Sequence, residues 1–212
     1  MIERIRIHQE DIHRWLDSHE KSKELPLYSS VDIRDSGLKM AVVDTNLFPA
    51  GFNNLCEHGL ADSVRFMREA ILRRAPNGKD ILIIAEEHTR NTWYLENIRT
   101  LQQIIQQAGF QVTVATRVTD HGDRITSEGF KLVPIGLSRR SRNPLRELRF
   151  LIELVRIYRT ERPDIVHHVA VKPVLYGSLA AWAARIPAVV NALAGMGYLF
   201  TSKRCDARLL RP

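Results

Sequence analysis

From residue 80 onward, short apolar runs alternate with helix-like patterns. Runs of strand length fall at residues 80–86, 110–116, 131–135, 163–169 and 188–192. Between them, apolar side chains recur every three or four residues, which predicts helices over residues 91–107, 144–159 and 173–185. A strand, a helix and a strand in succession form a βαβ unit, whose right-handed crossover makes the two strands parallel. The pattern therefore predicts an α/β fold: a doubly wound, mostly parallel Rossmann-like sheet with flanking helices.

The first part of the chain is less regular. Residues 8–21 carry Ile12, Trp15 and Leu16 at helical spacing among charged residues, which predicts an amphipathic N-terminal helix. Residues 23–37 predict a loop, and the apolar run at residues 38–44 predicts a short buried strand.

Two helices have predicted inward faces. Over residues 59–74 the inward side chains are expected to be Leu60, Val64, Met67 and Ile71. Over residues 144–159 they are expected to be Leu148, Leu151, Ile152 and Val155.

Charge divides the chain into two unlike parts. Residues 117–212 hold 17 Lys and Arg against 8 Asp and Glu, whereas residues 1–116 hold 14 against 16. A basic surface favours anionic partners such as phosphates or acidic lipid headgroups. The run of Arg139, Arg140, Arg142 and Arg146 suits an acidic membrane surface or a diphosphate, and equally a solvated helix face. Nucleic acid is a weaker expectation, because no aromatic residues are interleaved with this basic run.

Cysteine content and hydropathy bear on the compartment. Cys56 and Cys205 are the only cysteines and form no CxxC pair, which favours a reducing cytoplasm. No apolar stretch reaches the roughly 18–20 residues that a membrane span needs. We therefore expect a cytoplasmic protein, either free or in peripheral contact with the inner face of the membrane.

Polar residues follow two of the predicted strands, where ligands of open α/β sheets bind. Asp44, Asn46, Asn53 and Asn54 offer donors and acceptors suited to an amino-acid substrate. Further along, Arg90 is suited to bind a carboxylate in a bidentate manner, with Asn91 beside it at the start of a helix. The alternative is that these Asn and Asp residues build turns and cap helices.

Three strings in the first half resemble the amino-terminal region of the proteobacterial-type glutamate–cysteine ligase. They are VDIRDSG at residues 31–37, VVDTNLFPAGFNNL at residues 42–55 and EHTRNTWYLEN at residues 87–97. The resemblance covers about residues 1–113 and implies formation of γ-glutamylcysteine with ATP and Mg²⁺ in the full-length family. This chain has no GxxxxGK[ST] or GxGxxG loop and no later acidic cluster for Mg²⁺, so we expect no cofactor for it alone.

The second half resembles a different family, the bacterial family 4 glycosyltransferases. The strings are GFKLVPI at residues 129–135, RPDIVHHVAVKPVLYGS at residues 162–178 and VNALAGMGYLFTS at residues 190–202. The resemblance covers about residues 114–210, the amino-terminal, acceptor-side domain of that family. It implies a lipid-linked acceptor, with the nucleotide sugar bound by a domain not represented here. The substrate-binding candidates in this half are Lys172 and Gly177, which lie in these strings, and Gly195 and Gly197. The last two would let the backbone approach a ligand closely, or equally form a tight turn.

Histidines supply the remaining candidate chemistry. His167 and His168 alternate along a predicted strand, so their rings should face opposite sides and not chelate one ion. His121 follows a strand and is the acid–base candidate, although a turn histidine is the commoner case. No metal site is expected. Glu153 and Glu161 lie on one helix and are expected to be surface charge.

These observations favour a chimeric or truncated protein that is inactive alone. It would consist of a ligase-like segment at residues 1–113 and a transferase-like segment at residues 114–212, merged into one sheet or kept as two lobes. The alternatives are a transferase acceptor domain that acts with a separate nucleotide-sugar domain, or a non-catalytic module that binds anionic surfaces. The expected partner is a small-molecule substrate or a lipid-linked acceptor, and the sequence leaves the oligomeric state open.

Overall fold

The computed structural model describes residues 6–20, 26–86, 92–117, 131–137 and 143–193. In chain order the elements are α2 (Gln9–Glu20), β1 (Ser30–Asp35), β2 (Met40–Asn46), η1 (Phe52–Asn54), α3 (Glu57–Arg74), β3 (Asp80–Ala85), α4 (Thr92–Gln107), β4 (Gln111–Thr116), β5 (Lys131–Pro134), α6 (Pro144–Glu161), β6 (Ile165–Val169), α7 (Val171–Ala184) and β7 (Ala188–Ala192).

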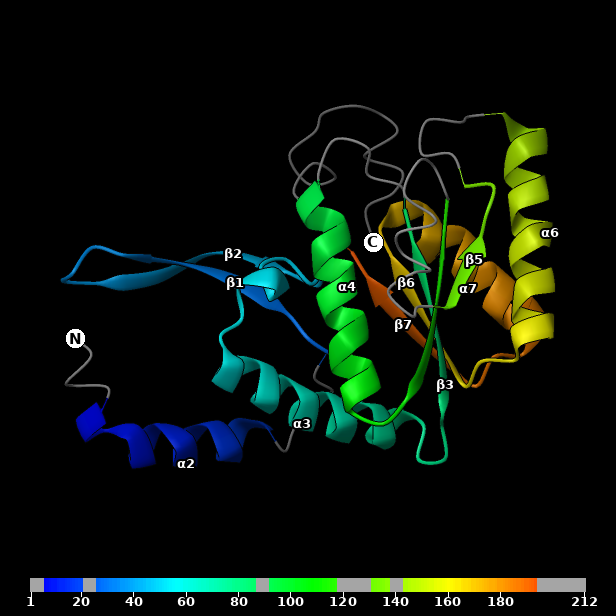
Figure 1. The fold of residues 1–212 in the computed structure, drawn as a ribbon. Coiled ribbons are helices and arrows are strands. Elements are labelled where there is room, and N and C mark those ends of the chain that lie inside the picture. The colour runs from blue at the N-terminus through cyan, green and yellow to red at the C-terminus, as the bar shows by residue number, and fades with distance from the viewer. Residues whose placement is uncertain (1–5, 21–25, 87–91, 118–130, 138–142, 194–212) are drawn as a thin grey trace.

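The centre of the molecule is a five-stranded sheet in the order β5-β4-β3-β6-β7 (Figure 1). Every neighbouring pair in it is parallel. The predicted α/β class is therefore confirmed, and all five strands fall where the apolar runs placed them. β3 belongs to the first half of the chain and lies between β4 and β6, so both halves contribute to one sheet.

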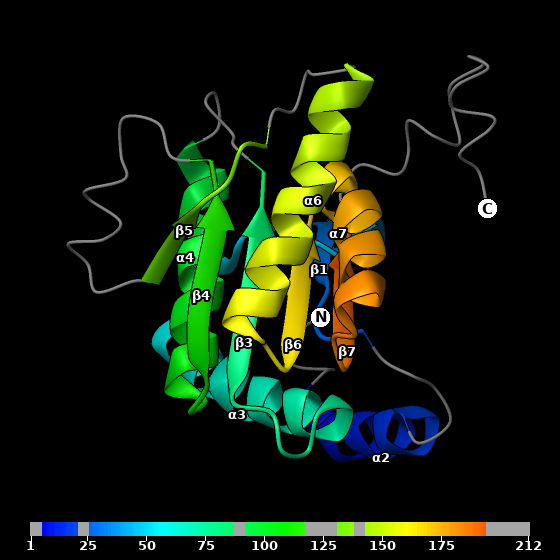
Figure 2. The same cartoon turned by 90° about the vertical axis from the view of Figure 1, so that its right-hand side faces the viewer.

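Helices cover both faces of this sheet and build two cores. On one face, Met67 and Ile71 of α3 and a row of α4 residues pack against Ile81 and Ile83 of β3. On the other face, α6 and α7 lie side by side, as Figure 2 shows, over Leu82, Ile84 and Val166. This two-sided burial explains why β3 is a continuous apolar run, since every side chain after its first residue is buried.

The N-terminal strands form a separate antiparallel hairpin that extends away from the main sheet (Figure 1). The strand predicted at residues 38–44 is present as β2, but the prediction that it is buried is wrong, because β2 is exposed along almost its whole length. The predicted loop at residues 23–37 is also wrong in part, since it contains β1. Gly37, with φ +81°, permits the connecting turn, and its N–H is bound by the Asp35 carboxylate at 2.7 Å.

The inward face of α6 differs from the predicted one by about one residue of rotation. Phe150, Leu154 and Tyr158 are buried, whereas Leu148 is 53% and Ile152 45% exposed. The other two predicted residues, Leu151 and Val155, do pack against the core. The predicted face of α3 is confirmed, with Met67 and Ile71 buried and Leu60 and Val64 packed against them. Among the described residues, no helix combines the length and the apolar character that crossing a bilayer requires.

Candidate functional site

The carboxyl ends of β3 and β6 bring together a set of charged side chains. Glu86 follows the last residue of β3 and is only 4% exposed. One of its carboxylate oxygens accepts the backbone N–H of Lys172, in the first turn of α7, at 3.3 Å. Its own backbone N–H lies 3.1 Å from the hydroxyl of Tyr94 on α4. Glu86 therefore joins helices from both faces of the sheet at its carboxyl edge.

Lys172 connects this carboxylate to a second one. Its Nζ lies 2.8 Å from Oε1 of Glu147 on α6, and both side chains are largely buried, at 19% and 15% exposure. Tyr176, one turn further along α7, also hydrogen-bonds to Glu147; burial and then this carboxylate raise the pKa of the Tyr176 hydroxyl. We call Glu86, Glu147, Lys172 and Tyr176 the carboxyl-edge cluster. It presents two carboxylates and one ammonium, which are complements for a small zwitterion.

The residue that precedes α7 has an unusual backbone. Ala170 has φ 87° and ψ 167°, a region that glycine populates and other residues avoid. Its N–H donates to the carbonyl of Ala192 at the end of β7, at 3.0 Å. This conformation turns the chain so that the N–H of Lys172 meets Glu86. Strain is thus stored next to the carboxyl-edge cluster.

Replacing Ala170 with glycine should raise the free energy of unfolding by about 1 kcal/mol, because glycine adopts this conformation without a steric penalty. Urea denaturation at neutral pH measures the change. Ala183→Gly, in an exposed position of the same helix, is the matched control and should lower stability by about 1 kcal/mol. Equal destabilisation by both substitutions would show that Ala170 is not strained.

Two histidines lie buried at the centre of β6, and their rings face opposite sides of the sheet as predicted. His167 Nδ1 is 3.1 Å from the carbonyl of Val190, and its Nε2 is 2.6 Å from the hydroxyl of Tyr28. Because a carbonyl only accepts, Nδ1 carries the hydrogen and Nε2 accepts from Tyr28. Burial, opposed in part by the bond to Val190, lowers the pKa of His167 to about 4.

His168 has a matching arrangement on the α6–α7 side. Its Nε2 lies 2.8 Å from the hydroxyl of Tyr158, and its Nδ1 lies 2.8 Å from Oδ1 of Asn191. Burial lowers the pKa of His168 to about 4. Burial also raises the pKa of both tyrosines. Each ring is therefore a neutral, fully bonded group at neutral pH, which is a structural role rather than that of an exposed acid or base.

The structure separates the polar residues of the segment after β2. Asp44 and Asn46 lie on the hairpin and bond to each other, from Nδ2 of Asn46 to the Asp44 carboxylate at 2.8 Å. Asn53 lies in η1, where its backbone N–H donates to Oδ1 of Asn97 on α4 at 3.1 Å. Its neighbour Asn54 is exposed. Of these four residues, Asn53 is the one that a hydrogen bond ties to α4, the helix that also carries Tyr94.

The other sequence candidates fall in different places. Lys172 belongs to the carboxyl-edge cluster, and Arg146 is exposed on α6. Gly177 is buried inside α7, where a Cβ would stand 2.4 Å from Nε2 of His168. Its position gives it a packing role. The remaining candidates lie outside the described residues: His121, Arg90, Asn91, Gly195, Gly197, Arg139, Arg140 and Arg142.

Sequence reasoning missed three of the four members of the cluster. Glu86, Glu147 and Tyr176 were not candidates, since their partners are distant in sequence. The two glutamates expected to be surface charge have specific partners. Glu153 accepts the backbone N–H of Gly136 with both carboxylate oxygens, at 3.1 and 3.0 Å, so it fixes the chain after β5. Glu161 pairs with Lys131. Among the described residues, no three His, Cys, Asp or Glu side chains converge as a metal site.

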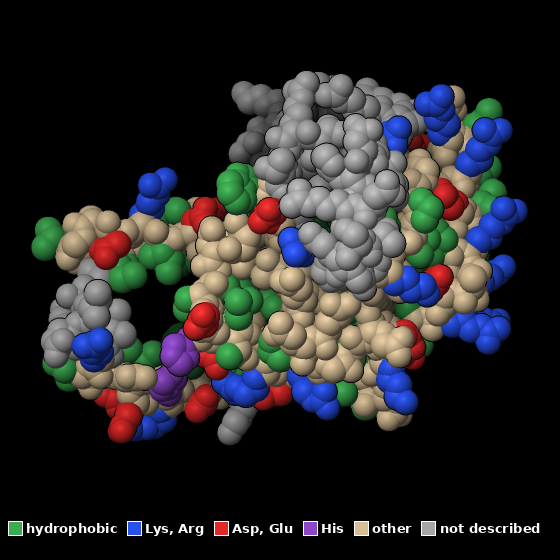
Figure 3. Space-filling view, viewed as in Figure 1, with side chains coloured by type: hydrophobic (Ala, Val, Ile, Leu, Met, Phe, Trp, Pro, Cys, Tyr) green, Lys and Arg blue, Asp and Glu red, His purple; other side chains and the backbone are tan. Residues whose placement is uncertain are grey.

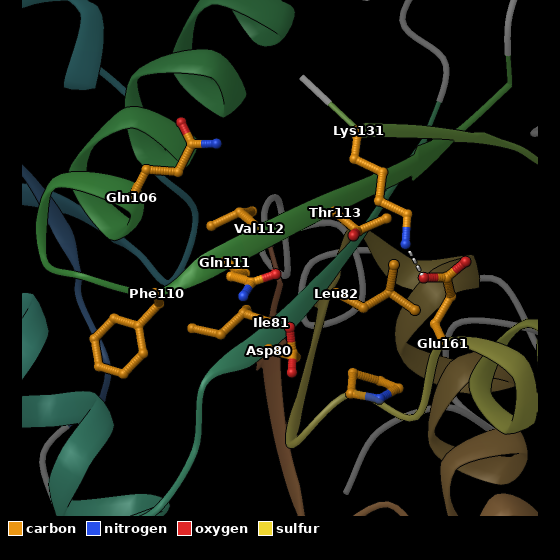
Figure 4. Close-up of a pocket in the computed structure, with 11 residues that line it drawn as sticks. Asp80, Ile81, Leu82, Gln106, Phe110, Gln111, Val112, Thr113, Lys131 and Glu161 are labelled. Carbon is orange, nitrogen blue, oxygen red and sulfur yellow. Dashed lines mark hydrogen bonds and ion pairs between the residues drawn. The ribbon is translucent and has the colours of Figure 1, made fainter. Parts of the chain in front are cut away.

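A pocket of 470 Å³ lies at the opposite end of the sheet, near the amino ends of β3 and β4 (Figure 4). Figure 4 shows Lys131 and Glu161 meeting across its side, with Gln106 and Phe110 on the other. Ligands of parallel α/β sheets bind beyond the carboxyl ends of the strands. We therefore place the candidate site at the carboxyl-edge cluster and not in this pocket.

Comparison with known proteins identifies relatives. The family model described as "Glutamate-cysteine ligase" matches residues 3–185, and so continues across residue 113. A solved structure from Methylobacillus flagellatus KT, described as a gamma-glutamylcysteine synthetase, is 34% identical with a TM-score of 0.51. The match covers 64% of this chain and 33% of that one, so the chain spans about a third of that protein's length. No curated protein matches the chain.

Two further solved structures share less with the chain. A glycosyltransferase from Rickettsia africae ESF-5 is 16% identical, with a TM-score of 0.43, over 54% of this chain and 29% of its own. MurG from Acinetobacter baumannii is 19% identical, with a TM-score of 0.43, over 55% of this chain and 36% of its own.

Proposed function

Because the chain belongs to the glutamate–cysteine ligase family, we propose that these 212 residues bind the amino-acid substrate of such a ligase and do not complete ATP-dependent ligation by themselves. The family relation supports the substrate class. The limit on activity is supported by the coverage, since the match spans a third of the solved synthetase. It is supported also by the first turn of α7, where the backbone N–H of Lys172 already donates to the Glu86 carboxylate.

The carboxylate of Glu86 is the observation that carries this proposal. In parallel α/β sheets, nucleotide phosphates bind to the free N–H groups at the start of a helix that follows a strand. At the start of α7, Glu86 already accepts the N–H of Lys172. A phosphate at this turn would meet a buried carboxylate of the same charge, which costs free energy. This end of the sheet is therefore better suited to an ammonium group than to a nucleotide phosphate.

An amino acid complements the carboxyl-edge cluster. Its ammonium group is the natural partner of the Glu86 and Glu147 carboxylates, and its carboxylate is the partner of the Lys172 ammonium. Tyr176 adds a hydroxyl beside Glu147. Asn53 is a further candidate contact from the ligase-like segment, because η1 packs against α4.

Glutamate titration followed by calorimetry tests the binding step. Lys172→Ala should weaken glutamate binding about tenfold or more, the value of one charge-assisted hydrogen bond to a carboxylate. Lys131→Ala removes another ion-paired lysine, at the amino ends of the strands, and should leave glutamate affinity unchanged. Equal affinity in the parent chain and in Lys172→Ala would contradict a role for the cluster.

An ADP-release assay tests the second step. The purified chain supplied with glutamate, cysteine, ATP and Mg²⁺ should release no more ADP than a blank without glutamate. Glutamate-dependent ADP release, or saturable ATP binding by this chain alone, would overturn the proposal.

A second candidate function follows from the position of one transferase-like string. Residues 162–178 form β6 and the first turns of α7, and so place Lys172 at the carboxyl edge of the sheet. We propose, as the alternative, that residues 114–210 derive from a glycosyltransferase acceptor domain, which would make the chain a chimera. Farnesyl diphosphate, a short lipid diphosphate, is the probe. Its binding without any glutamate binding would favour this candidate over the ligase-related one.

A further inference from the structure

The outer surface of the α6–α7 layer is apolar to an unusual degree. α7 is apolar on its inner side, where Gly177 and Ala180 are buried, and also on its outer side. A helix that is apolar all round is normally buried on all sides. Large apolar side chains are exposed along the outer sides of both helices: Leu148 and Ile152 of α6, and Leu175, Leu179 and Trp182 of α7. Trp182 is 81% exposed.

The outer sides of the two helices adjoin each other. α6 and α7 lie side by side in Figure 2, and NH2 of Arg159 reaches the carbonyl of Ala183 at 3.3 Å. We call Leu148, Ile152, Leu175, Leu179 and Trp182 the outer patch. Several large exposed apolar side chains on adjoining helices are typical of an interaction site.

The carboxylates of α6 bind partners within the molecule, whereas its arginines are exposed. The carboxylates of this helix are all engaged: Glu147 with Lys172, Glu153 with the Gly136 N–H, and Glu161 with Lys131. Its arginines are all exposed instead: Arg146, Arg149, Arg156 and Arg159. Figure 3 shows Lys and Arg side chains in a column along the edge of the molecule where α6 lies. The outer patch is therefore bordered by positive charge.

A groove beside the outer patch combines basic and apolar side chains. It has a volume of 410 Å³ and lies on α6 beside β5, lined by Arg149, Arg156, Ile152 and Ile157 together with Pro134 and Glu153. The Glu153 carboxylate is turned to the backbone of Gly136, so the two guanidinium groups are the positive groups of the groove. A pocket with two arginines and two isoleucines fits a group that is anionic at one end and apolar at the other.

We propose that the outer patch and the arginines of α6 dock on an anionic lipid bilayer. The apolar side chains would enter the headgroup region, and Arg149, Arg156 and Arg159 would contact lipid phosphates. Charge complementarity selects this occupant over a second copy of the chain. A two-fold interface would oppose the same arginines to each other, which repels.

Vesicle co-sedimentation tests the charge requirement. The chain should bind mixed phosphatidylglycerol–phosphatidylcholine vesicles, bind pure phosphatidylcholine vesicles far less, and dissociate as salt is raised. Arg149→Gln with Arg156→Gln should weaken partitioning about thirtyfold, since each basic side chain near an anionic surface contributes roughly a factor of five. Arg34→Gln with Arg73→Gln changes the net charge equally, away from the patch, and should have little effect.

Tryptophan fluorescence tests the orientation. Trp15 and Trp93 are exposed elsewhere, so replacing both with Phe leaves Trp182 as the reporter. Its emission should shift to shorter wavelength with phosphatidylglycerol vesicles, whereas a chain that retains only Trp15 should show no shift. Three results would overturn the proposal. They are no binding to anionic vesicles, an equal loss of vesicle binding in the Arg149/Arg156 and Arg34/Arg73 double variants, or a dimer that depends on Trp182 and does not bind lipid.

Discussion

Replacing Gly177 with alanine is expected to lower the free energy of unfolding by about 2–4 kcal/mol. A Cβ at this position would lie 2.4 Å from Nε2 of His168 and 2.5 Å from its Cδ2. Both distances are well below van der Waals contact, and the imidazole is held on its two nitrogens by Tyr158 and Asn191. The ring must move, so the substitution adds overpacking strain to the loss of at least one buried hydrogen bond.

Gly59→Ala is the matched control for this substitution. Gly59 is also a helical glycine, in α3, but its added Cβ would meet only ordinary contacts, at 3.5 Å from Leu55 and 3.6 Å from Cys56. Alanine should therefore stabilise the helix by up to about 1 kcal/mol there. Urea denaturation of both variants should give shifts of opposite sign. An unchanged midpoint for Gly177→Ala would show that α7 does not hold His168 as tightly as described.

Acid should destabilise the fold in a window set by the two buried histidines. The pKa of each is lowered from 6.5 to about 4 by burial. As the pH falls through 6.5, the unfolded chain takes up protons that the folded chain does not. The contribution of the two neutral histidines to the free energy of unfolding is thus complete above pH 6.5 and is lost progressively as the pH falls toward 4. The loss is roughly 3 kcal/mol for each histidine, a large share of the stability of an ordinary domain.

Denaturation between pH 7.5 and pH 5 isolates this effect, because most carboxylates titrate below that range. His168→Asn should remove about half of the pH dependence, whatever it does to stability at pH 7.5. His58→Gln, at an exposed histidine of α3, should leave the slope unchanged. A parent chain equally stable at pH 7.5 and pH 5 would contradict the neutral, buried state of the rings.

The main sheet could be predicted from sequence because its strands are buried on both faces and separated by helices. Under those conditions a strand is a continuous apolar run, as residues 80–86 show. The hairpin could not be predicted in the same way. The run at residues 38–44 has the same composition as a buried strand. Only its pairing with residues 30–35 shows that it belongs to an exposed hairpin and not to the main sheet. The Asp-Ser-Gly turn before it was the available signal.

The candidate site was less accessible to sequence reasoning. Alternation along β6 correctly placed His167 and His168 on opposite faces. Their partners could not be predicted, since Tyr28 lies 139 residues from His167. Glu147 became part of the site only because α6 packs with its Phe150 face inward, a rotation that apolar spacing alone did not resolve.

The position of β3 has a consequence for how the chain can be divided. A cut between residues 113 and 114 would pass through the middle of β4, and would separate β3 from β6, its other neighbour. The first fragment would keep β3, but most of the backbone groups on both of its edges would be unpaired. The second fragment would lack β3 and so would leave β6 without its neighbour on that side. Such fragments gain their backbone hydrogen bonds only from each other. The protein therefore gains or loses its native state as one cooperative unit.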